Sequence, residues 1–246
     1  MAQKLKDYYD EEFVRKLSNK IIAVNSSFDA NKFISKYKDE YKDKEFLERQ
    51  DLCVEALELS LNDNYSKNIQ CFSKILGPEL QTTTGMFSEG WWLWPIGRYV
   101  EKHGLEDFSV SINFIYDLTK RHTGEFSIRP LLKKHPKKVL SILLKWSLDE
   151  NVHVRRLASE GIRIKLPWAR RLDIFLEYFD ECVAILNNLK NDKSNFVQKS
   201  VANNINDLMK VDRTKAVRLI SAWKNNNPSK ETLKIIKHGS RSLKKY

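Results

Sequence analysis

Apolar residues recur along most of the chain at spacings of three and four positions, and no stretch alternates apolar and polar residues over the length of a strand. That spacing places apolar side chains on one face of an α-helix. We therefore predict an all-α protein with almost no sheet, in which Asp180, Ser194 and Ser229 cap helix N-termini. The predicted helices span residues 10–24, 28–38, 45–61, 65–76, 94–103, 107–121, 125–134, 136–148, 151–164, 168–178, 180–190, 195–210, 213–225 and 229–243.

An internal repeat organises the second half of the chain. Residues 149–162 align with residues 192–205 at an offset of 43, and the helices that precede them align at the same offset. Residues 217–223 resemble a third copy of the preceding helix. A two-helix period near 43 lies in the range of HEAT and armadillo repeats. The sequence therefore predicts a superhelical α-solenoid of stacked HEAT-like helix pairs with a concave groove.

The charge of +11 is unevenly distributed. Residues 120–171 contain 14 Lys and Arg against four acids, and residues 193–246 contain 13 against three, so the remaining residues sum to −9. One interpretation is that the lysines are solvated helix faces. The asymmetry instead favours a localised binding site for a polyanion, and a duplex fits a basic groove of this size.

One predicted helix carries an electrostatic conflict. Arg156, Glu160 and Arg163 fall on one polar face of the helix at 151–164, which ends before Pro167. Arginine forks bind phosphate, whereas a carboxylate among them repels the same ligand. Either Glu160 is a structural ion-pair partner, or it has a separate chemical role.

The repeat relates this face to the next copy. Arg156 and Glu160 correspond to Lys199 and Asn203, and Asp207 lies one turn beyond Asn203 on the same face. Second helices of stacked pairs tend to line the concave surface. We therefore expect these positions to converge on one groove.

Several familiar chemistries are absent from the sequence. The histidines show no pairing with a serine or cysteine nucleophile, and Cys53, Cys71 and Cys182 lack the spacing of a zinc site. We expect buried free thiols, no metal and no cofactor. No apolar run approaches the roughly 20 residues of a membrane span, and the N-terminus becomes acidic where a signal peptide is apolar.

The remaining candidates for catalytic groups are carboxylates and a tryptophan in a basic groove. This set suits cleavage of an N-glycosidic bond to a cationic base, because carboxylates stabilise an oxocarbenium-like transition state and an indole holds a cationic ring. Taken singly, Glu125 is better explained as a helix N-terminal acid, Asp207 as a surface carboxylate and Trp168 as a core anchor. Trp91, Trp92 and Trp94 are mostly explained as core, with one of them a candidate to line the groove.

At these residues the chain resembles the AlkC-type DNA alkylation repair glycosylases of the HEAT-like repeat superfamily, which are related to AlkD. The matching blocks are Thr-Gly-Glu-Phe-Ser-Ile-Arg-Pro at 123–130, His-Val-Arg-Arg-Leu-Ala-Ser-Glu-Gly at 153–161, Leu-Pro-Trp at 166–168 and Val-Ala-Asn-Asn-Ile-Asn-Asp at 201–207. Gly-Trp-Trp-Leu-Trp-Pro at 90–95 and Gly-Leu-Glu-Asp-Phe at 104–108 add to the resemblance.

The resemblance implies a monofunctional glycosylase that removes 3-methyladenine, and in this branch 3-methylcytosine, from double-stranded DNA in base excision repair. It implies that Glu125, Glu160 and Asp207 are the active-site acids and Trp168 the aromatic wall. The implied DNA contacts are Arg156, Arg163, Arg129, Lys199 and Lys165. The expected protein is a monomer in the bacterial cytoplasm, associated with the nucleoid and not with a membrane.

Some positions depart from the family pattern. The family's Arg-Pro-Arg before Leu-Pro-Trp reads Arg-Ile-Lys at 163–165, which loses a proline and keeps both cations. Gln198 replaces a commonly basic residue, which predicts a weaker phosphate contact. We expect one domain over 1–246, with N-terminal helices to about residue 86, catalytic repeats over 87–246 and no C-terminal immunoglobulin-like domain.

Two other functions stay open on the sequence. The first alternative to the enzyme is a catalytically silent HEAT-like DNA-binding protein, and the second is a protein-interaction scaffold. The presence of all three acids favours the enzyme over the silent binder, and the localised basic segments argue against the scaffold.

Overall fold

A computed structural model describes residues 4–245, except for the side chains of Phe87 and of residues 243–245. Every regular element over residues 4–245 is helical, which confirms the predicted all-α class. The chain divides into two compact units, Met1–Ser127 and Ile128–Tyr246. This division lies about 40 residues beyond the expected change near residue 86. No helix within residues 4–245 is long and apolar enough to cross a bilayer.

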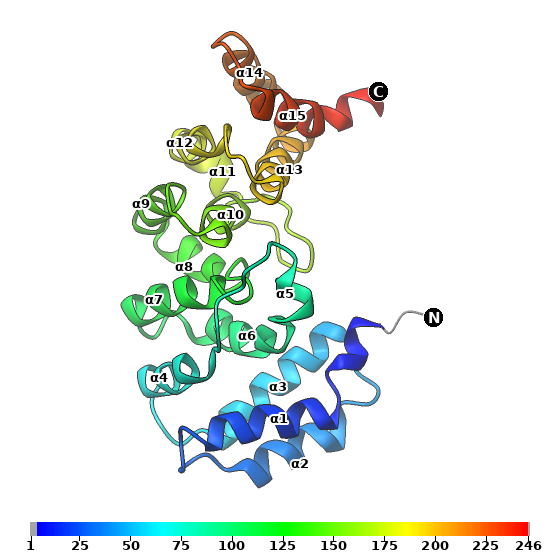
Figure 1. Ribbon diagram of the computed structural model, residues 1–246, viewed down its shortest axis with the longest axis vertical. Helices are drawn as coiled ribbons and strands as arrows, with labels where there is room; N and C mark the ends of the chain where they lie inside the picture. The colour runs from blue at the N-terminus through cyan, green and yellow to red at the C-terminus, as the bar shows by residue number, and fades with distance from the viewer. Residues whose placement is uncertain (1–3, 246) are drawn as a thin grey trace. The chain divides into compact units, whose positions relative to one another are not determined.

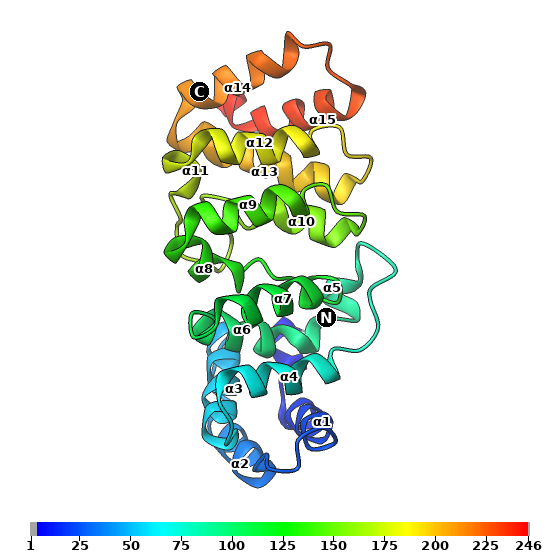
Figure 2. The same cartoon turned by 90° about the vertical axis from the view of Figure 1, so that its left-hand side faces the viewer.

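The first unit packs its helices around an aromatic core. Helix α2 packs on both α1 and α3, α3 also packs on α6, and α4 packs on α7 (Figures 1 and 2). Tyr9, Phe33, Tyr37 and Phe72 are fully buried in this core. The elements are η1 (Leu5–Tyr8), α1 (Glu11–Ile22), α2 (Ala30–Glu40), α3 (Phe46–Ser60), α4 (Tyr65–Ile75), α5 (Gly85–Ser88), η2 (Trp91–Leu93), α6 (Trp94–His103) and α7 (Phe108–Thr119).

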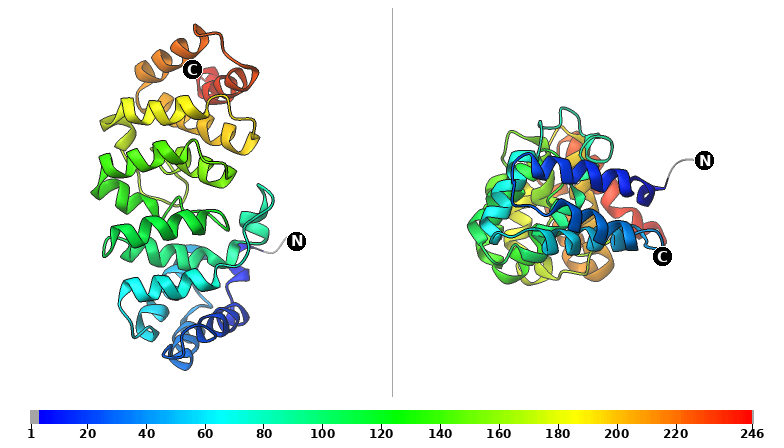
Figure 3. Two further views of the ribbon diagram at one scale, coloured as in Figure 1. Left: turned by 60° about the vertical axis from the view of Figure 1, so that its left-hand side comes forward. Right: turned by 90° about the horizontal axis from the view of Figure 1, so that it is seen from below.

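The second unit is built from stacked helix pairs. Its elements are α8 (Ile128–Lys134), α9 (Pro136–Trp146), α10 (Val152–Glu160), α11 (Ile174–Glu177), α12 (Phe179–Leu189), α13 (Asn195–Val211), α14 (Arg213–Lys224), α15 (Lys230–Gly239) and η3 (Ser240–Lys245). Helix α9 packs on α12, whereas α10 packs on α13 and α13 on α15. The unit therefore has a row of first helices and a row of second helices (Figures 1 and 3).

The helix bounds reproduce the repeat found in the sequence. Helix α12 begins and ends 43 residues after α9, and α13 begins 43 residues after α10. Each pair repeats the same contact with the next, because both helices of a pair bury their apolar faces against their successors. The predicted HEAT-like repeat is confirmed.

One predicted helix ends early. Helix α10 stops at Glu160 with Gly161 as its C-cap, so Arg163 does not lie on the helix. Residues 161–173 form a loop, although 161–164 and 168–173 were predicted to be helical. Pro167 lacks an amide hydrogen and disfavours helical backbone at the preceding residue. The apolar residues Ile162, Ile164 and Leu166 alternate with the cations Arg163 and Lys165, a spacing of two that does not continue the helical pattern.

The helix starts agree with the predicted caps at two of three positions. Ser229 caps α15 by accepting a hydrogen bond from the Thr232 amide at 3.2 Å, and Ser194 occupies the N-cap position of α13. Asp180 lies inside the first turn of α12, so its prediction as a cap was wrong. The turns at η1, α5 and η2 were missed, because three or four residues show no periodicity.

Candidate functional site

A single guanidinium joins two carboxylates from successive repeats. Arg163, in the loop after α10, donates through Nη1 to Glu160 Oε1 at 2.7 Å. Its Nε donates to Asp207 Oδ2 at 3.0 Å. Glu160 is the last residue of α10 and Asp207 lies in α13, so the two acids come from neighbouring second helices. We call Glu160, Arg163 and Asp207 the buried triad.

The unequal lengths of the two second helices produce this arrangement. The repeat equates Glu160 with Asn203, yet α13 continues two turns beyond that point to Val211. The extension carries Asp207 past the end of α10, where the chain has already left the helix. Arg163 therefore reaches Asp207 from the loop.

A hydroxyl chain holds the second oxygen of Glu160. Ser200 Oγ donates to Glu160 Oε2 at 2.6 Å, and Ser159 Oγ lies 2.7 Å from Ser200 Oγ. Arg156 places Nη2 3.4 Å from Glu160 Oε1, and its guanidinium lies over the Phe196 ring at 5.1 Å. Both carboxylate oxygens of Glu160 are thus fixed by protein donors.

The triad is almost removed from solvent, and Glu160 stays charged there. Glu160 and Asp207 are each 4% exposed and Arg163 is 8% exposed. Burial alone would raise the pKa of Glu160, but Arg156, Arg163 and the Ser200 hydroxyl outweigh it and hold the pKa below its ordinary value of 4.5. Glu160 is therefore a carboxylate at neutral pH and not a proton donor.

Burying such a network does not by itself stabilise a fold. Removing charges from water costs several kcal/mol per ion, and a well-packed apolar replacement is often as stable. The two carboxylates of the triad are balanced by Arg163 and Arg156. The arrangement fixes the positions of both carboxylates in a poorly solvated environment, where electrostatic interactions are strongest.

A second arginine clamps the loop that carries Arg163. Arg129, from α8, donates through Nη1 to the Arg163 carbonyl at 2.9 Å and to the Gly161 carbonyl at 3.3 Å. Its Nη2 donates to the Arg170 carbonyl at 2.7 Å. Arg129 is only 7% exposed, and its hydrogen bonds hold both ends of the segment 161–170.

The clamped loop presents Trp168 to solvent. Its φ is +62°, a left-handed conformation that is strained for a bulky side chain, and the residue is 53% exposed. The interpretation of Trp168 as a core anchor was therefore wrong. Strain of this kind costs of order 1–3 kcal/mol and concentrates at functional sites, where the surrounding structure enforces it.

The predicted DNA contacts divide by exposure. Lys165 and Lys199 are exposed, and Lys199 lines a surface groove of about 280 Å³ between α13 and α15 with Lys234 and His238. Arg129 and Arg163 are buried against protein oxygens, as described above, and Arg156 is partly buried. Their contacts with DNA stay predictions, and the structure shows all three of these arginines in contact with other protein groups.

Glu125 belongs to the first unit. It lies in the turn before α8 and not in that helix, and it is 8% exposed. Thr123 Oγ1 donates to Glu125 Oε2 at 3.0 Å and accepts from the Glu125 amide at 3.3 Å. The structure therefore connects Glu160 to Asp207 through Arg163, whereas Glu125 contacts Thr123 of its own turn.

Comparison with known proteins reveals a family resemblance. A family model described as "DNA alkylation repair enzyme" matches residues 122–236. A solved structure of the Pseudomonas fluorescens alkylpurine DNA glycosylase AlkC, bound to DNA containing an abasic site analog, is 31% identical with a TM-score of 0.86 and covers all of this chain. The chain therefore resembles the DNA alkylation repair enzymes.

Two further proteins are similar to the chain. YhaZ, an uncharacterized protein of Bacillus subtilis, is 31% identical over 242 residues, which is 98% of this chain. AlkD2 from Streptococcus mutans is 22% identical over 96% of this chain and 98% of its own, with a TM-score of 0.40, too low to bear on the fold. The chain spans 65% of YhaZ and 66% of AlkC.

The family match covers most of the second unit and only the last residues of the first. Residues 122–236 contain the buried triad, the clamp Arg129 and the exposed Trp168. Over the described residues, no group of three or more His, Cys, Asp or Glu side chains has the arrangement of a metal site.

Ser200 is a site residue that the sequence prediction missed. It aligns with the buried Leu157 of the preceding repeat, on the apolar face of the helix. A hydroxyl where the repeat expects an apolar side chain was the available signal, because a buried polar group needs a partner. Asn204, which donates to the Ser159 carbonyl at 2.8 Å, shows the same departure.

Proposed function

We propose that this protein is a DNA N-glycosylase that hydrolyses the bond between deoxyribose and a cationic alkylated base. The proposed substrates are 3-methyladenine and 3-methylcytosine in double-stranded DNA. The observation that carries the proposal is the joining of Glu160 and Asp207, from successive repeats, by Arg163 on the loop that exposes Trp168.

The chemistry requires charge stabilisation more than acid catalysis. A base that already carries a positive charge leaves as a neutral molecule, so no proton donor is needed at the base. Positive charge then develops on the sugar, and a fixed carboxylate stabilises it. Glu160 is suited to this role because its arginine partners keep it ionised. Water adds to the sugar, and the product is an abasic site.

Each proposed catalytic residue has a distinct role. Glu160 and Asp207 supply negative charge towards the sugar, and Trp168 supplies an aromatic face beside the lesion. Glu125, which the family resemblance adds, is proposed as the third acid. Arg163 is proposed to position both carboxylates, in addition to any contact with DNA.

The charge of the second unit supports the proposed partner. Residues 128–246 contain 26 Lys and Arg against 11 Asp and Glu, a net charge of +15. Exposed Lys165 and Lys199 are proposed to contact phosphates, with Arg156 beside them, and Arg129 is proposed to act mainly through the loop it clamps. We expect binding of the duplex by one copy of the chain.

The test is mass spectrometry of bases released from DNA treated with a methylating agent. We expect 3-methyladenine to appear with the protein and to be absent with unmethylated DNA. A second reaction on DNA that contains 3-methylcytosine tests the wider lesion range. If no alkylated base is released even with enzyme in excess over lesions, while the protein still binds the DNA, the chain is a silent DNA-binding protein and the proposal is wrong.

A further inference from the structure

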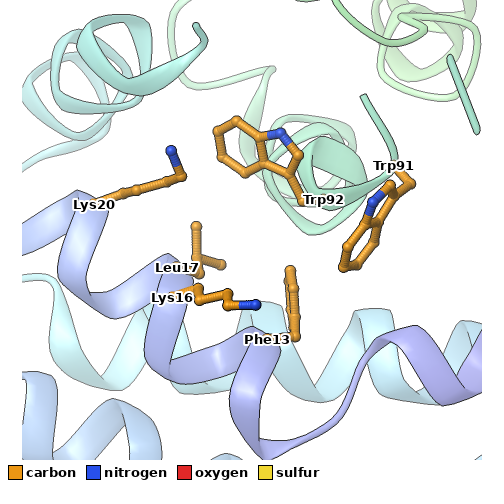
Figure 4. Close-up of a pocket in the computed structure, with 6 residues that line it drawn as sticks. All are labelled: Phe13, Lys16, Leu17, Lys20, Trp91 and Trp92. Atoms are coloured by element: carbon orange, nitrogen blue, oxygen red, sulfur yellow. The ribbon is translucent and has the colours of Figure 1, made fainter. Parts of the chain in front are cut away.

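The first unit contains a small aromatic pocket that the proposed function does not use. It lies between α1 and the turn Trp91–Leu93, and its volume is about 160 Å³. Phe13, Leu17, Trp91 and Trp92 form its walls, together with the stems of two lysines, Lys16 and Lys20 (Figure 4). Every lining residue belongs to Met1–Ser127.

The walls of the pocket are held rigid by buried neighbours. The hydroxyl of Tyr9 donates to the Trp91 carbonyl at 2.7 Å, and the Tyr9 and Phe13 rings contact the Trp91 ring at centroid distances of 5.3 and 5.6 Å. Tyr9 is fully buried, and Phe13 is 4% exposed. A pocket built this way is preformed, so a ligand does not have to order its walls.

A glycine fixes the turn that carries both tryptophans. A Cβ added to Gly90 would lie 2.0 Å from the carbonyl oxygen of Arg121, so the turn packs directly on the backbone that follows α7. Any side chain at this position would clash with that backbone and displace the turn that carries Trp91 and Trp92. The pocket therefore depends on a close backbone approach that only glycine allows.

The rim of the pocket is positively charged. Lys20 Nζ lies 4.8 Å from the centroid of the Trp92 ring. Lys16, one helical turn earlier, pairs with Glu12 at 2.6 Å, and both of those side chains are exposed. No acidic residue lines the pocket itself. A ligand that combines a flat apolar group with a negative charge fits these walls and this rim.

Size and chemistry narrow the ligand further. Pockets for drug-sized molecules measure about 300–1,000 Å³, so this one admits a single ring system. Its aromatic walls offer faces for stacking, and its lining offers no backbone donor or acceptor to a peptide main chain. Single-stranded nucleic acids are bound in this way, by aromatic side chains that stack on the bases and cations that follow the phosphates.

We propose that the pocket binds one unpaired nucleobase of a nucleic acid strand, with its adjacent phosphate held by Lys20 and Lys16. Because recognition uses ring faces and not base edges, the pocket accepts any of the bases. The site is separate from the buried triad and does not require glycosylase activity.

The experiment measures binding of the full chain to a dye-labelled thymidine oligonucleotide of about six nucleotides by fluorescence anisotropy. A strand of equal length with abasic sugars carries the same phosphates and serves as the reference for binding by charge alone. We expect the thymidine strand to bind about tenfold more tightly than the abasic strand, since stacking on tryptophan adds to the phosphate contacts.

Two substitutions assign this difference to the pocket. Trp92→Leu keeps an apolar wall and removes the indole face, and Lys20→Gln keeps the stem and removes the charge. We expect Trp92→Leu to remove the preference for the thymidine strand and Lys20→Gln to weaken binding of both strands. Lys32→Gln, an exposed lysine of α2, is the matched control and should change neither. Thermal unfolding of each variant checks that the fold is retained.

Two outcomes would overturn the proposal. Equal binding of the two strands by the unmodified chain would show that only phosphates are bound. Binding of a short acidic peptide that contains an aromatic residue, lost in Trp92→Leu while oligonucleotide binding is unchanged, would assign the pocket to a protein partner. Release of 3-methyladenine by a chain with either outcome would leave the proposed glycosylase intact.

Discussion

The two units each contain an arginine between two carboxylates, and the two arrangements differ in burial. In the first unit, Arg98 lies 2.6 Å from Asp51 and 2.6 Å from Glu101, with side chains that are 31, 48 and 22% exposed. We call these three residues the exposed triad. In the buried triad the side chains of Arg163, Glu160 and Asp207 are only 10, 5 and 6% exposed.

The comparison shows that ion-pair geometry alone does not mark a site. Exposed pairs contribute about 0–1 kcal/mol and need no functional explanation. Burying charged side chains costs desolvation free energy. The fold does not require that cost, because apolar side chains of similar volume could occupy the same space with equal stability. The setting differs as well: residues 1–127 contain 17 Lys and Arg against 21 acids, whereas the second unit carries +15.

The largest expected effect is on stability. Arg163→Met leaves two buried carboxylates without their shared cation, and we expect the free energy of unfolding to fall by about 3–5 kcal/mol. Arg98→Met should cost at most about 1 kcal/mol, because water replaces the lost contacts. Urea denaturation of both variants measures the difference. Equal losses would mean that the burial of the triad has no energetic consequence.

The next effect is on catalysis. Glu160→Gln removes the charge but keeps the shape, and we expect the single-turnover rate of 3-methyladenine release to fall about 10²–10³-fold, as when a group that stabilises transition-state charge is removed. DNA affinity should be retained. Glu101→Gln is the matched change in the exposed triad and should release base at the unmodified rate. Full activity in Glu160→Gln would reduce Glu160 to an ion-pair partner.

A smaller effect concerns acid. The pKa of Glu160 is lowered in the folded chain, so the unfolded chain takes up its proton first as the pH falls below the ordinary value of 4.5. The stability from this group is therefore complete above that value and lost as the pH falls through the folded pKa. Denaturation of the unmodified chain and of Glu160→Gln at pH 7 and at lower pH should show their difference shrinking. If the difference in free energy of unfolding between the two proteins instead grew as the pH fell, the pKa of Glu160 would be raised in the folded chain and not lowered.

The smallest effect separates the charges of the two units. Lys199→Gln should weaken duplex binding modestly and lower the slope of log affinity against log salt by about one, because one phosphate contact is lost. Lys32→Gln removes a charge from the acidic unit and should leave the slope unchanged. Anisotropy titrations over a salt series measure both. Identical slopes in all three proteins would exclude Lys199 as a phosphate contact.

The fold could be predicted to a large extent because helix periodicity is local. The spacing of apolar residues located most helices within a few positions, and the offset of 43 anticipated the stacking of α9 on α12 and of α10 on α13. The loop 161–173 was missed because its first apolar residues, Ile162 and Ile164, directly follow a helical stretch. The left-handed Trp168 was equally out of reach, since bulky residues rarely adopt that conformation.

The candidate site was less predictable, because its contacts depend on tertiary register. Glu160 and Asp207 could be placed on one row by the repeat, but the reach of Arg163 depends on where α10 ends and how far α13 continues. The sequence shows Ser200 at the position that aligns with the apolar Leu157 of the preceding repeat. Its partner, Glu160, became evident only from the packing of α10 on α13.

The origin of the two acids in different repeats has a consequence for folding cooperativity. In repeat proteins, stability is approximately a sum of nearest-neighbour interfaces, and single interfaces open below the free energy of global unfolding. The buried triad spans one such interface, that of α10 with α13. It therefore exists only while these neighbours are docked, and on warming the chain would lose its charged site before it loses its helices.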